Sequence, residues 1–236
     1  ACQIASRLVD MVYVLSTPGN QAIVQRMKYE QATFVTITKD ELWDTIDLVD
    51  AVLMGPGLPE TKEHVKLAGR LLHDFDDKET VLDASILYKI DPLWLHKNCV
   101  VTPHMREFAE LFHCEPTSEN TQKMAAYYGC RIVLKGRYDY VSNGKELCEN
   151  RTGNAGMTKG GTGDVLAGLI AGLACTNDLS LAARAGVYLN GLAGERLYEK
   201  QGTFYNAEDV VRELGRVWKG VVEVDAERGI VRIVSK

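Results

Sequence analysis

The sequence predicts an α/β protein in which a mostly parallel central sheet carries helices on both faces. Two observations lead to this fold class. Short β-branched runs alternate with stretches of helical periodicity along most of the chain. Several of the runs are apolar at every position, which is typical of parallel strands covered on both faces. Ligands of such sheets bind beyond the carboxyl ends of the strands, so the residues that follow each strand are the candidates for function.

The individual elements follow from these patterns. Strands are expected at Met11–Leu15, Thr33–Thr38, Ala51–Met54, Thr80–Asp83, Cys99–Thr102 and Arg131–Leu134. Helices are expected at Gln21–Tyr29, Glu60–His73, Glu107–Leu111, Thr121–Tyr128, Val165–Ala174, Leu179–Lys200 and Ala207–Val217. Asn143-Gly144 predicts a hairpin between Tyr138–Ser142 and Lys145–Cys148, and Glu227–Gly229 predicts a second one between Val221–Val224 and Ile230–Val234.

Composition narrows the class of protein. The chain has 236 residues, 46% of them hydrophobic and 25% charged, and no linker or repeat, so residues 1–236 are expected to form one domain. A net charge of −5 without a basic stripe argues against nucleic acid as a partner, and the apolar runs are too short for a membrane span. We expect no signal peptide. Six scattered cysteines indicate reduced thiols in a cytoplasmic protein, and their spacing matches no zinc site.

A glycine-rich segment that runs directly into an apolar helix is the most informative part of the chain. Residues 150–164 end in Gly-Gly-Thr-Gly-Asp. Glycines allow close approach to a ligand, and successive amide N–H groups at a helix start attract phosphate. Asp164 would repel that phosphate, but it fits if its carboxylate takes a proton from a hydroxyl while the amides hold charge on the phosphoryl group. The structural alternative is an N-cap role for Asp164.

Further candidate residues follow the predicted strands. They are Gly55-Pro56-Gly57-Leu58, His104 within Pro103–Phe108, and Lys135-Gly136. The glycines permit close backbone approach, His104 would hold its ring free at the sheet edge, and Lys135 could reach a nucleotide phosphate. Asp83 could hold a metal ion, hydrogen-bond a substrate or cap the next helix. Each residue also has an ordinary structural interpretation, and it is their common position at one sheet edge that favours a site.

In this order, the segments resemble those of the ribokinase-like superfamily and, within it, the NAD(P)H-hydrate dehydratases that use ADP or ATP. The resemblance covers roughly residues 1–215. The matching motifs are Gly55–Gly57, Val81–Ala84, Thr102–Phe108, Val133–Gly136, Thr152–Gly168 and Ala185–Glu195. Only the glycine motif is highly specific by itself. The resemblance implies a ribokinase-like three-layer sandwich with a mostly parallel central sheet and helices on both faces.

The resemblance also implies an activity, namely the nucleotide-dependent dehydration of the S form of hydrated NADH or NADPH. By analogy with kinases, Asp164 would deprotonate the substrate hydroxyl while amides of Gly161–Gly163 stabilise the transferring phosphoryl group. Gly57, His104 and Asp164 would contact the hydrated cofactor. Lys135, Gly136, Asn154, Gly160, Gly161 and Gly163 would line the ADP or ATP site. Mg²⁺ is expected to bridge the phosphates, and no protein ligand is assigned to it.

The chain departs from the family pattern at several places. Ser85 stands where a second acidic residue is usual, Arg106 where a small residue is usual, and Lys159 where a small or apolar residue is more common. Lys159 could help nucleotide binding or compensate for charge elsewhere. The strand and glycine-rich turn with which the family opens have no counterpart before Cys2–Leu8, and the tail after Val217 has no clear match.

Two other functions remain open at this point. A kinase for a small vitamin precursor could use the same glycine loop, although the Thr102–Phe108 segment favours the dehydratase. A nucleotide-binding module without catalysis is the other alternative, and the presence of Asp164 argues against it. We also expect a homo-oligomer, because the small residues of Ala182–Gly186 and Gly191–Gly194 suit tight helix contacts within or between subunits.

Overall fold

A six-stranded sheet forms the centre of the computed structural model, which describes residues 1–27, 34–225 and 230–233, with side chains as far as residue 220. Its strand order is β3-β4-β5-β6-β7-β8. The first four strands are parallel, namely β3 (Ala51–Met54), β4 (Glu79–Leu82), β5 (Cys99–Val101) and β6 (Arg131–Leu134). The hairpin of β7 (Asp139–Ser142) and β8 (Leu147–Asn150) then adds antiparallel strands. The predicted mostly parallel sheet and the Asn-Gly hairpin are confirmed.

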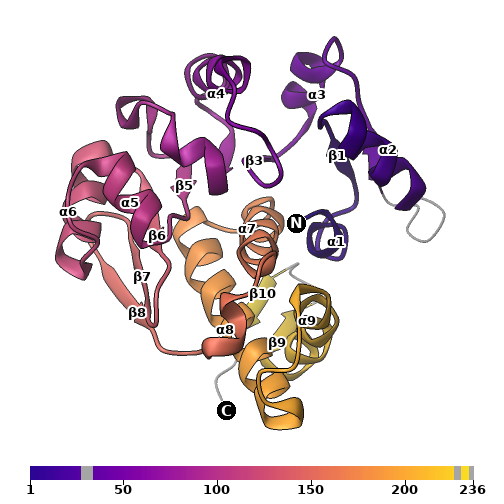
Figure 1. Ribbon diagram of the computed structural model, residues 1–236, viewed down its shortest axis with the longest axis vertical. Coiled ribbons are helices and arrows are strands. Elements are labelled where there is room, and N and C mark those ends of the chain that lie inside the picture. Colours follow the sequence, from indigo (N-terminus) through magenta and orange to yellow (C-terminus); the bar gives the residue numbers. More distant parts are fainter. Residues whose placement is uncertain (28–33, 226–229, 234–236) are drawn as a thin grey trace.

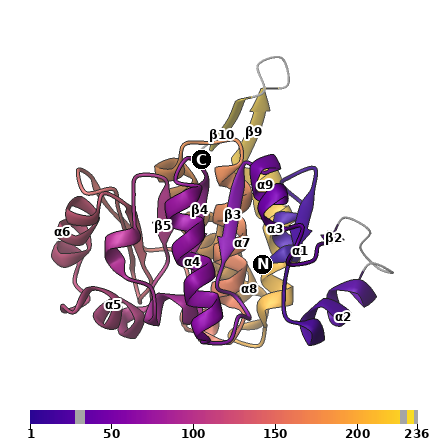
Figure 2. The same cartoon turned by 90° about the horizontal axis from the view of Figure 1, so that it is seen from above.

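Helices cover both faces of this sheet, which gives three layers (Figures 1 and 2). One face carries α4 (Lys62–Asp74), α5 (Met105–Phe112) and α6 (Ser118–Tyr128). The other carries α7 (Thr162–Ala174) and α8 (Leu179–Gln201), with α9 (Ala207–Val221) packed on α8.

Consecutive residues of β4 serve the two cores. Val81 belongs to the cluster that contains the residues of α7 and α8, whereas Leu82 belongs to the cluster with α4 and α5. Both side chains are fully buried, as the unbroken apolar character of the strand predicts.

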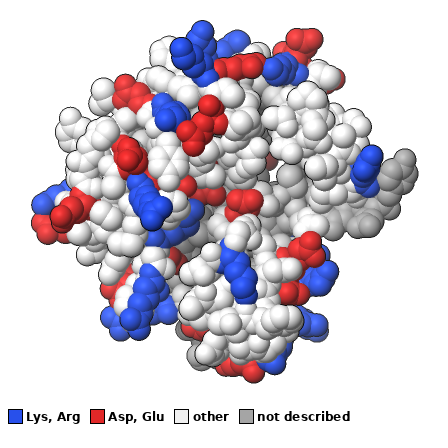
Figure 3. All heavy atoms as spheres, viewed as in Figure 1, with Lys and Arg blue, Asp and Glu red and all other residues white. Residues whose placement is uncertain are grey.

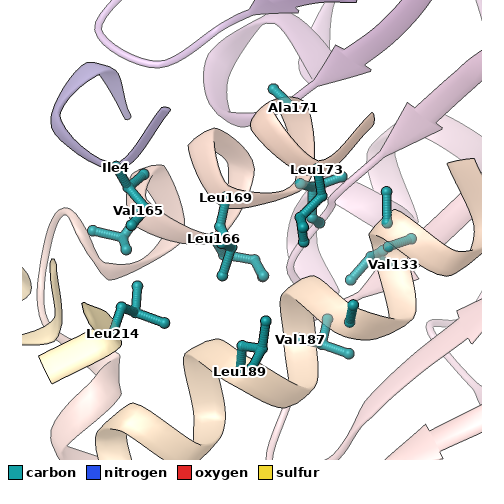
Figure 4. Packing of buried hydrophobic residues seen from close by; sticks show 14 of the residues in the cluster. Ile4, Val133, Val165, Leu166, Leu169, Ala171, Leu173, Val187, Leu189 and Leu214 are labelled. Carbon is teal, nitrogen blue, oxygen red and sulfur yellow. The ribbon is translucent and has the colours of Figure 1, made fainter. Parts of the chain in front are cut away.

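Helix α7 lies at the centre of the larger core and is apolar on every side. Eleven of its 13 residues are buried, because it is enclosed by the sheet, by α8 and α9, and by the short helix α1 (Cys2–Ala5). Figure 4 shows Ile4 of α1 and Leu214 of α9 packed around this helix. A side chain at Gly168 would meet the backbone of Ala1, so α1 and α7 can approach this closely only with glycine at that position.

The N-terminal part forms a second, smaller sheet. β1 (Val12–Val14) and β2 (Phe34–Thr36) are parallel, and among the described residues they pair only with each other. The single sheet that the strand pattern predicts is therefore divided into two. The helices α2 (Pro18–Met27) and α3 (Leu42–Leu48) lie beside this small sheet at one end of the molecule, as Figure 1 shows.

The tail contains an antiparallel hairpin of β9 (Val222–Asp225) and β10 (Ile230–Ile233), as predicted. The expected turn at Glu227–Gly229 lies outside the described residues, as do Tyr29 and Thr33. Three short 3-10 turns were not predicted: η1 (Ala84–Tyr88), η2 (Pro92–Trp94) and η3 (Ala155–Thr158). Across the described part of the chain, no helix has both the length and the apolar character to cross a membrane.

Candidate active site

Three polar residues meet where β4, β5 and β6 end. Asp83 directly follows β4, Thr102 directly follows β5 and Lys135 directly follows β6. Because these strands are parallel, the three residues lie at one edge of the sheet. The Oδ1 atom of Asp83 accepts hydrogen bonds from Thr102 Oγ1 at 2.6 Å and from Lys135 Nζ at 2.7 Å. Asp83 is 1% exposed and Thr102 is fully buried. Asp83 occupies the cap position of η1 but makes no capping hydrogen bond, so of its predicted roles the helix cap is wrong.

The glycine-rich segment of residues 150–164, called the glycine loop from here on, approaches these three residues at Lys135. Gly161 has φ +89° and serves as the N-cap of α7, a conformation that favours glycine. The ammonium of Lys135 lies 3.5 Å from the position that a Cβ of Gly163 would occupy. The structure thus places Lys135 beside the first turn of α7, the end of a helix that attracts anions. Gly160 precedes the helix and has no described heavy atom within 4 Å of its Cβ position, which leaves that part of the loop open.

Asp164 lies in the first turn of α7, three residues after the N-cap, and is only partly exposed. The N-cap position belongs to Gly161 and not to Asp164, which argues against the N-cap alternative. Burial raises the pKa of its carboxyl group, and the nearby charge of Asp83 raises that pKa further, while Lys135 opposes the rise. A carboxylate with a raised pKa beside a cation and free helix amides is suited to accept a proton.

The ring of His104 is not free, contrary to prediction. His104 is the N-cap of α5, and its Nδ1 accepts hydrogen bonds from the backbone N–H groups of Arg106 and Glu107, both at 3.1 Å. The Glu107 carboxylate in turn accepts from the His104 N–H at 2.8 Å, which completes a capping box. The side chain of His104 is still about half exposed, but its Nε2 atom also lies 3.4 Å from the Glu107 carboxylate.

The turn after β3 is fitted closely to the backbone of Asp83. Gly55 has φ +128°, and a Cβ at this position would overlap the carbonyl oxygen of Asp83. Gly57 has φ +73°, and its carbonyl oxygen accepts a hydrogen bond from Asn20 Nδ2 at 3.3 Å. Ser85, one of the departures from the family pattern, donates to the carbonyl oxygen of Leu58 at 2.6 Å. It therefore holds the same turn in place.

Asn154 and Lys159 connect the glycine loop to the segment between α8 and α9. Asn154 Oδ1 accepts hydrogen bonds from Gly156 N–H at 2.8 Å and from the Tyr205 hydroxyl at 2.6 Å, while its buried Nδ2 has no partner among the described residues. Lys159 Nζ donates to the carbonyl oxygens of Thr203 and, at 2.7 Å, of Tyr205. The ammonium of Lys159 therefore attaches the glycine loop to the segment that follows α8.

Asp139 and Tyr205 contribute to the site and were not predicted. Asp139 Oδ1 accepts from the Gly136 N–H at 3.1 Å, which fixes the turn after Lys135, and burial raises the pKa of Asp139. Neither residue belongs to a motif or follows a strand of the parallel sheet. The role of Tyr205 arises from its bond to Asn154, 51 residues earlier, which no local pattern could have revealed. The bond of Asp139 to Gly136 is a local turn contact that sequence reasoning missed.

The described residues include no group of three or more His, Cys, Asp or Glu side chains suited to hold a metal ion. Asp83, the most enclosed carboxylate of the site, is already bonded to Lys135 and Thr102. Residues of the site therefore do not form a Mg²⁺ site of their own. Acidic and basic side chains are interspersed over the face shown in Figure 3.

Solved structures define the class of protein. A ribokinase-like superfamily protein from Enterococcus faecalis superposes with a TM-score of 0.80 over 92% of this chain and 81% of that chain, at 24% identity. The ADP/ATP-dependent NAD(P)H-hydrate dehydratase from Bacillus subtilis, co-crystallised with ATP/Mg²⁺, superposes with a TM-score of 0.72 over 92% of this chain and 84% of that chain, also at 24% identity. The chain therefore has the ribokinase-like fold, as the resemblance implied.

Sequence comparison identifies the family within this class. The sequence model of the NAD(P)H-hydrate dehydratase family matches residues 1–216. The bifunctional NAD(P)H-hydrate repair enzyme Nnr of Archaeoglobus fulgidus is 39% identical over 175 residues, which are 74% of this chain and 36% of that protein. The ADP-dependent (S)-NAD(P)H-hydrate dehydratase of Nitrosopumilus maritimus is 35% identical over 181 residues, 72% of this chain and 62% of that protein. The chain belongs to the NAD(P)H-hydrate dehydratase family, and it spans about a third of the length of the Archaeoglobus relative.

Proposed function

We propose that this protein dehydrates the S form of hydrated NADH or NADPH in a reaction driven by ADP or ATP, with Mg²⁺ bound to the nucleotide phosphates. The observation that carries the proposal is the position of Asp164. It lies in the first turn of α7 and directly follows Gly163, beside which the ammonium of Lys135 lies, at the end of the open glycine loop. A base and a phosphate-binding loop within one helical turn are suited to phosphoryl transfer to a hydroxyl. The named relatives suggest which hydroxyl is used.

The proposed reaction has two steps. The hydroxyl oxygen on the reduced nicotinamide ring attacks the terminal phosphoryl group, Asp164 takes the hydroxyl proton, and AMP leaves from ADP or ADP leaves from ATP. The carbon–oxygen bond then breaks and phosphate leaves with the electron pair, assisted by the lone pair of the ring nitrogen. Loss of a proton from the neighbouring ring carbon restores the dihydronicotinamide.

The residues around Asp164 would divide the binding work. Lys135, Gly136, Asn154, Gly160, Gly161 and Gly163 would line the nucleotide site, and Gly57 and His104 would contact the hydrated cofactor. The position of Lys135 beside Gly163 supports the nucleotide site, and the half-exposed side chain of His104 leaves surface for a contact with the cofactor. Mg²⁺ would neutralise charge on the phosphates and would be held mainly by them, because this cation usually keeps few protein ligands.

The test is to mix the purified protein with hydrated NADH or NADPH, Mg²⁺ and either ADP or ATP, and to follow the return of near-ultraviolet absorbance. Recovery that requires nucleotide is the expected result, and the better pair identifies the donor and the preferred substrate. A phosphorylated intermediate trapped by rapid quench would support the two-step order. Nucleotide binding without any recovery would instead favour a small-molecule kinase or a module without catalysis.

We further propose a cytoplasmic location and a single domain over residues 1–236. All six cysteines are free thiols, which suits a reducing compartment. The homo-oligomer stays a prediction. The small residues that suggested it are used inside the chain, where Gly186 packs against Ile170 and Gly194 against Met157. Gel filtration with light scattering would determine the oligomeric state.

A further inference from the structure

Asp83 is the most enclosed carboxylate of the site, and the reaction proposed above gives it no task. Its side chain accepts two hydrogen bonds on one oxygen, from Thr102 and from Lys135. It neither caps η1 nor belongs to a metal-binding group within the described residues. A buried carboxylate is stable only when a charge and hydrogen-bond donors compensate it, and here both come from residues of the site.

The backbone of Asp83 is fixed from two sides. Its N–H donates to the carbonyl oxygen of Met54 at 3.1 Å, and its own carbonyl oxygen lies where any side chain at Gly55 would be. The next residue, Ala84, adopts φ +60°, a conformation that is costly for any residue with a Cβ. The carboxylate therefore projects from a rigid position at the end of β4.

Lys135 reaches this carboxylate from the end of β6. Its N–H donates to the carbonyl oxygen of Pro103 at 2.8 Å, and an isolated parallel bridge pairs Lys135 with His104 beyond the end of the β5–β6 pairing. Its side chain is 20% exposed, and its ammonium lies between Asp83 and Gly163. Of the described residues, Asp83 supplies the only acceptor recorded for this ammonium, which has three N–H groups. The other two are available toward the glycine loop.

We propose that Asp83 and Thr102 are positioning residues that hold the ammonium of Lys135 at the phosphate end of the glycine loop before nucleotide binds. The proposal deepens the proposed function, because it rests on the nucleotide site described there. A free lysine is a flexible four-carbon chain that samples many rotamers. The short bond to a fixed carboxylate selects one of them, and the Thr102 hydroxyl holds that carboxylate oxygen in place. A phosphate then meets a donor already in position.

Two other roles of Asp83 predict different changes in ligand affinity when its charge is removed. If Asp83 merely neutralised Lys135, the carboxylate would compete with phosphate for the ammonium, and its removal would strengthen nucleotide binding. If Asp83 only stabilised the fold, its removal would weaken the binding of every ligand of the site alike. Binding of adenosine, AMP and ADP to the same variants separates the three roles, because adenosine lacks phosphate.

The experiment is calorimetric titration of the parent, Asp83→Asn, Lys135→Met and the double variant with these three probes. We expect Asp83→Asn to weaken ADP binding by about tenfold, the scale of one charge-assisted hydrogen bond, and to leave adenosine binding unchanged. The double variant should bind ADP no more weakly than Lys135→Met alone, because positioning has no effect once the ammonium is gone. Thr102→Val keeps both charges and should weaken ADP binding in the same direction.

A matched control is available in the contact between α8 and α9. Glu213 is equally buried and ion-paired, to Lys200 and Arg216 on α8 and α9, so Glu213→Gln removes a similar buried charge without touching the loop. It should leave the binding of all three probes unchanged. If Asp83→Asn does not fold, Thr102→Val and Lys135→Met still show whether ADP affinity falls or rises when the contact is lost.

Three results would overturn the proposal: tighter ADP binding by Asp83→Asn, equal losses for adenosine and ADP, or additive losses in the double variant. A parent protein that binds no ADP would also overturn it. If the parent binds ADP but restores no hydrated cofactor, the proposed dehydration fails while the binding titrations still test the role of Asp83. The two failures are therefore distinguishable.

Discussion

At the scale of single residues, Asp164 connects the chemistry of the site to pH. A base must be unprotonated to accept the substrate proton, and burial raises the pKa of this carboxyl group above its ordinary value. We expect Asp164→Asn to keep nucleotide binding and to lower turnover by a factor of about a hundred or more. In the parent, kcat should fall as the pH drops through the raised pKa of Asp164. Steady-state rates over a pH series check both points, and near-parent turnover of the variant would remove Asp164 from the mechanism.

The same substitution should make the protein more stable at neutral pH. A carboxyl group whose pKa is higher in the folded than in the unfolded state contributes stability below its unfolded pKa, and this contribution is lost as the pH rises through the folded pKa. Charged Asp164 is therefore destabilising at pH 7, and the neutral amide of Asn is not. Thermal unfolding should give a higher Tm for Asp164→Asn at pH 7, with the difference shrinking near pH 4, about the pKa of an unfolded aspartate. A lower Tm at pH 7 would contradict this reasoning.

The local setting of a residue could be predicted from the sequence where one short segment contains both the residue and its neighbours. Asp164 and its glycines meet this condition, since the loop and the start of α7 are consecutive in the chain. The state of Lys135 does not, because its partner Asp83 lies 52 residues earlier. For the same reason the Lys159 side chain, which binds carbonyl groups 44 and 46 residues later, could have been taken for a phosphate ligand. Predicting these pairs requires the strand order.

At the scale of elements, two helical glycines allow a matched test of helix packing. A Cβ at Gly186 of α8 would lie 2.5 Å from Cγ1 of Ile170 on α7, whereas Gly215 of α9 has no described heavy atom within 4 Å of its Cβ position. Gly186→Ala should destabilise the protein by about 1–3 kcal/mol through overpacking. Gly215→Ala should stabilise it by about 0.5–1 kcal/mol through helix propensity alone. Urea unfolding of the two variants measures the difference, and equal effects would show that α7 and α8 do not pack as described.

Elements with a strong period or a clear end signal were predicted, and those without were not. β3 and β6 have the predicted bounds, and α4 differs by only a few residues. α5 begins earlier than expected because His104, an uncommon cap residue, supplies the capping bonds. α3 was missed because it has seven residues and no side-chain cap at its start, so neither its period nor its boundary is visible in the sequence.

At the scale of the whole molecule, two buried cysteines report on global unfolding. Cys99 is fully buried and Cys130 is 1% exposed, in the core beneath α4 and α5. Burial raises the pKa of Cys99 to about 12 and that of Cys130 still further. Because the thiolate is the reactive form, neither thiol should react with an alkylating reagent in the native protein. Mass spectrometry after labelling with and without denaturant checks this, and native labelling of either residue would mean that this core opens locally.

The division of the strands into two sheets also belongs to this scale. The runs around β1 and β2 have the same β-branched character as the other strands, and nothing in them shows which partner they choose. Strand pairing depends on the arrangement of the whole chain, whereas strand formation depends on local residues. The order of the strands is therefore the part of the fold that local patterns could not provide.

The two hydrogen bonds of Lys159 to the segment after α8 have one further consequence, which concerns limited proteolysis. Phe204 is 89% exposed and lies between the carbonyl groups that bind Lys159. Chymotrypsin could cleave the peptide bond after it, while α9 stays attached through buried Val210, Leu214 and Val217. The two pieces of the cleaved protein would remain folded together, but Thr203 and Tyr205, which bind Lys159, could move apart. One broken bond, distant from Asp164 in sequence, would then loosen the glycine loop without removing any of its residues.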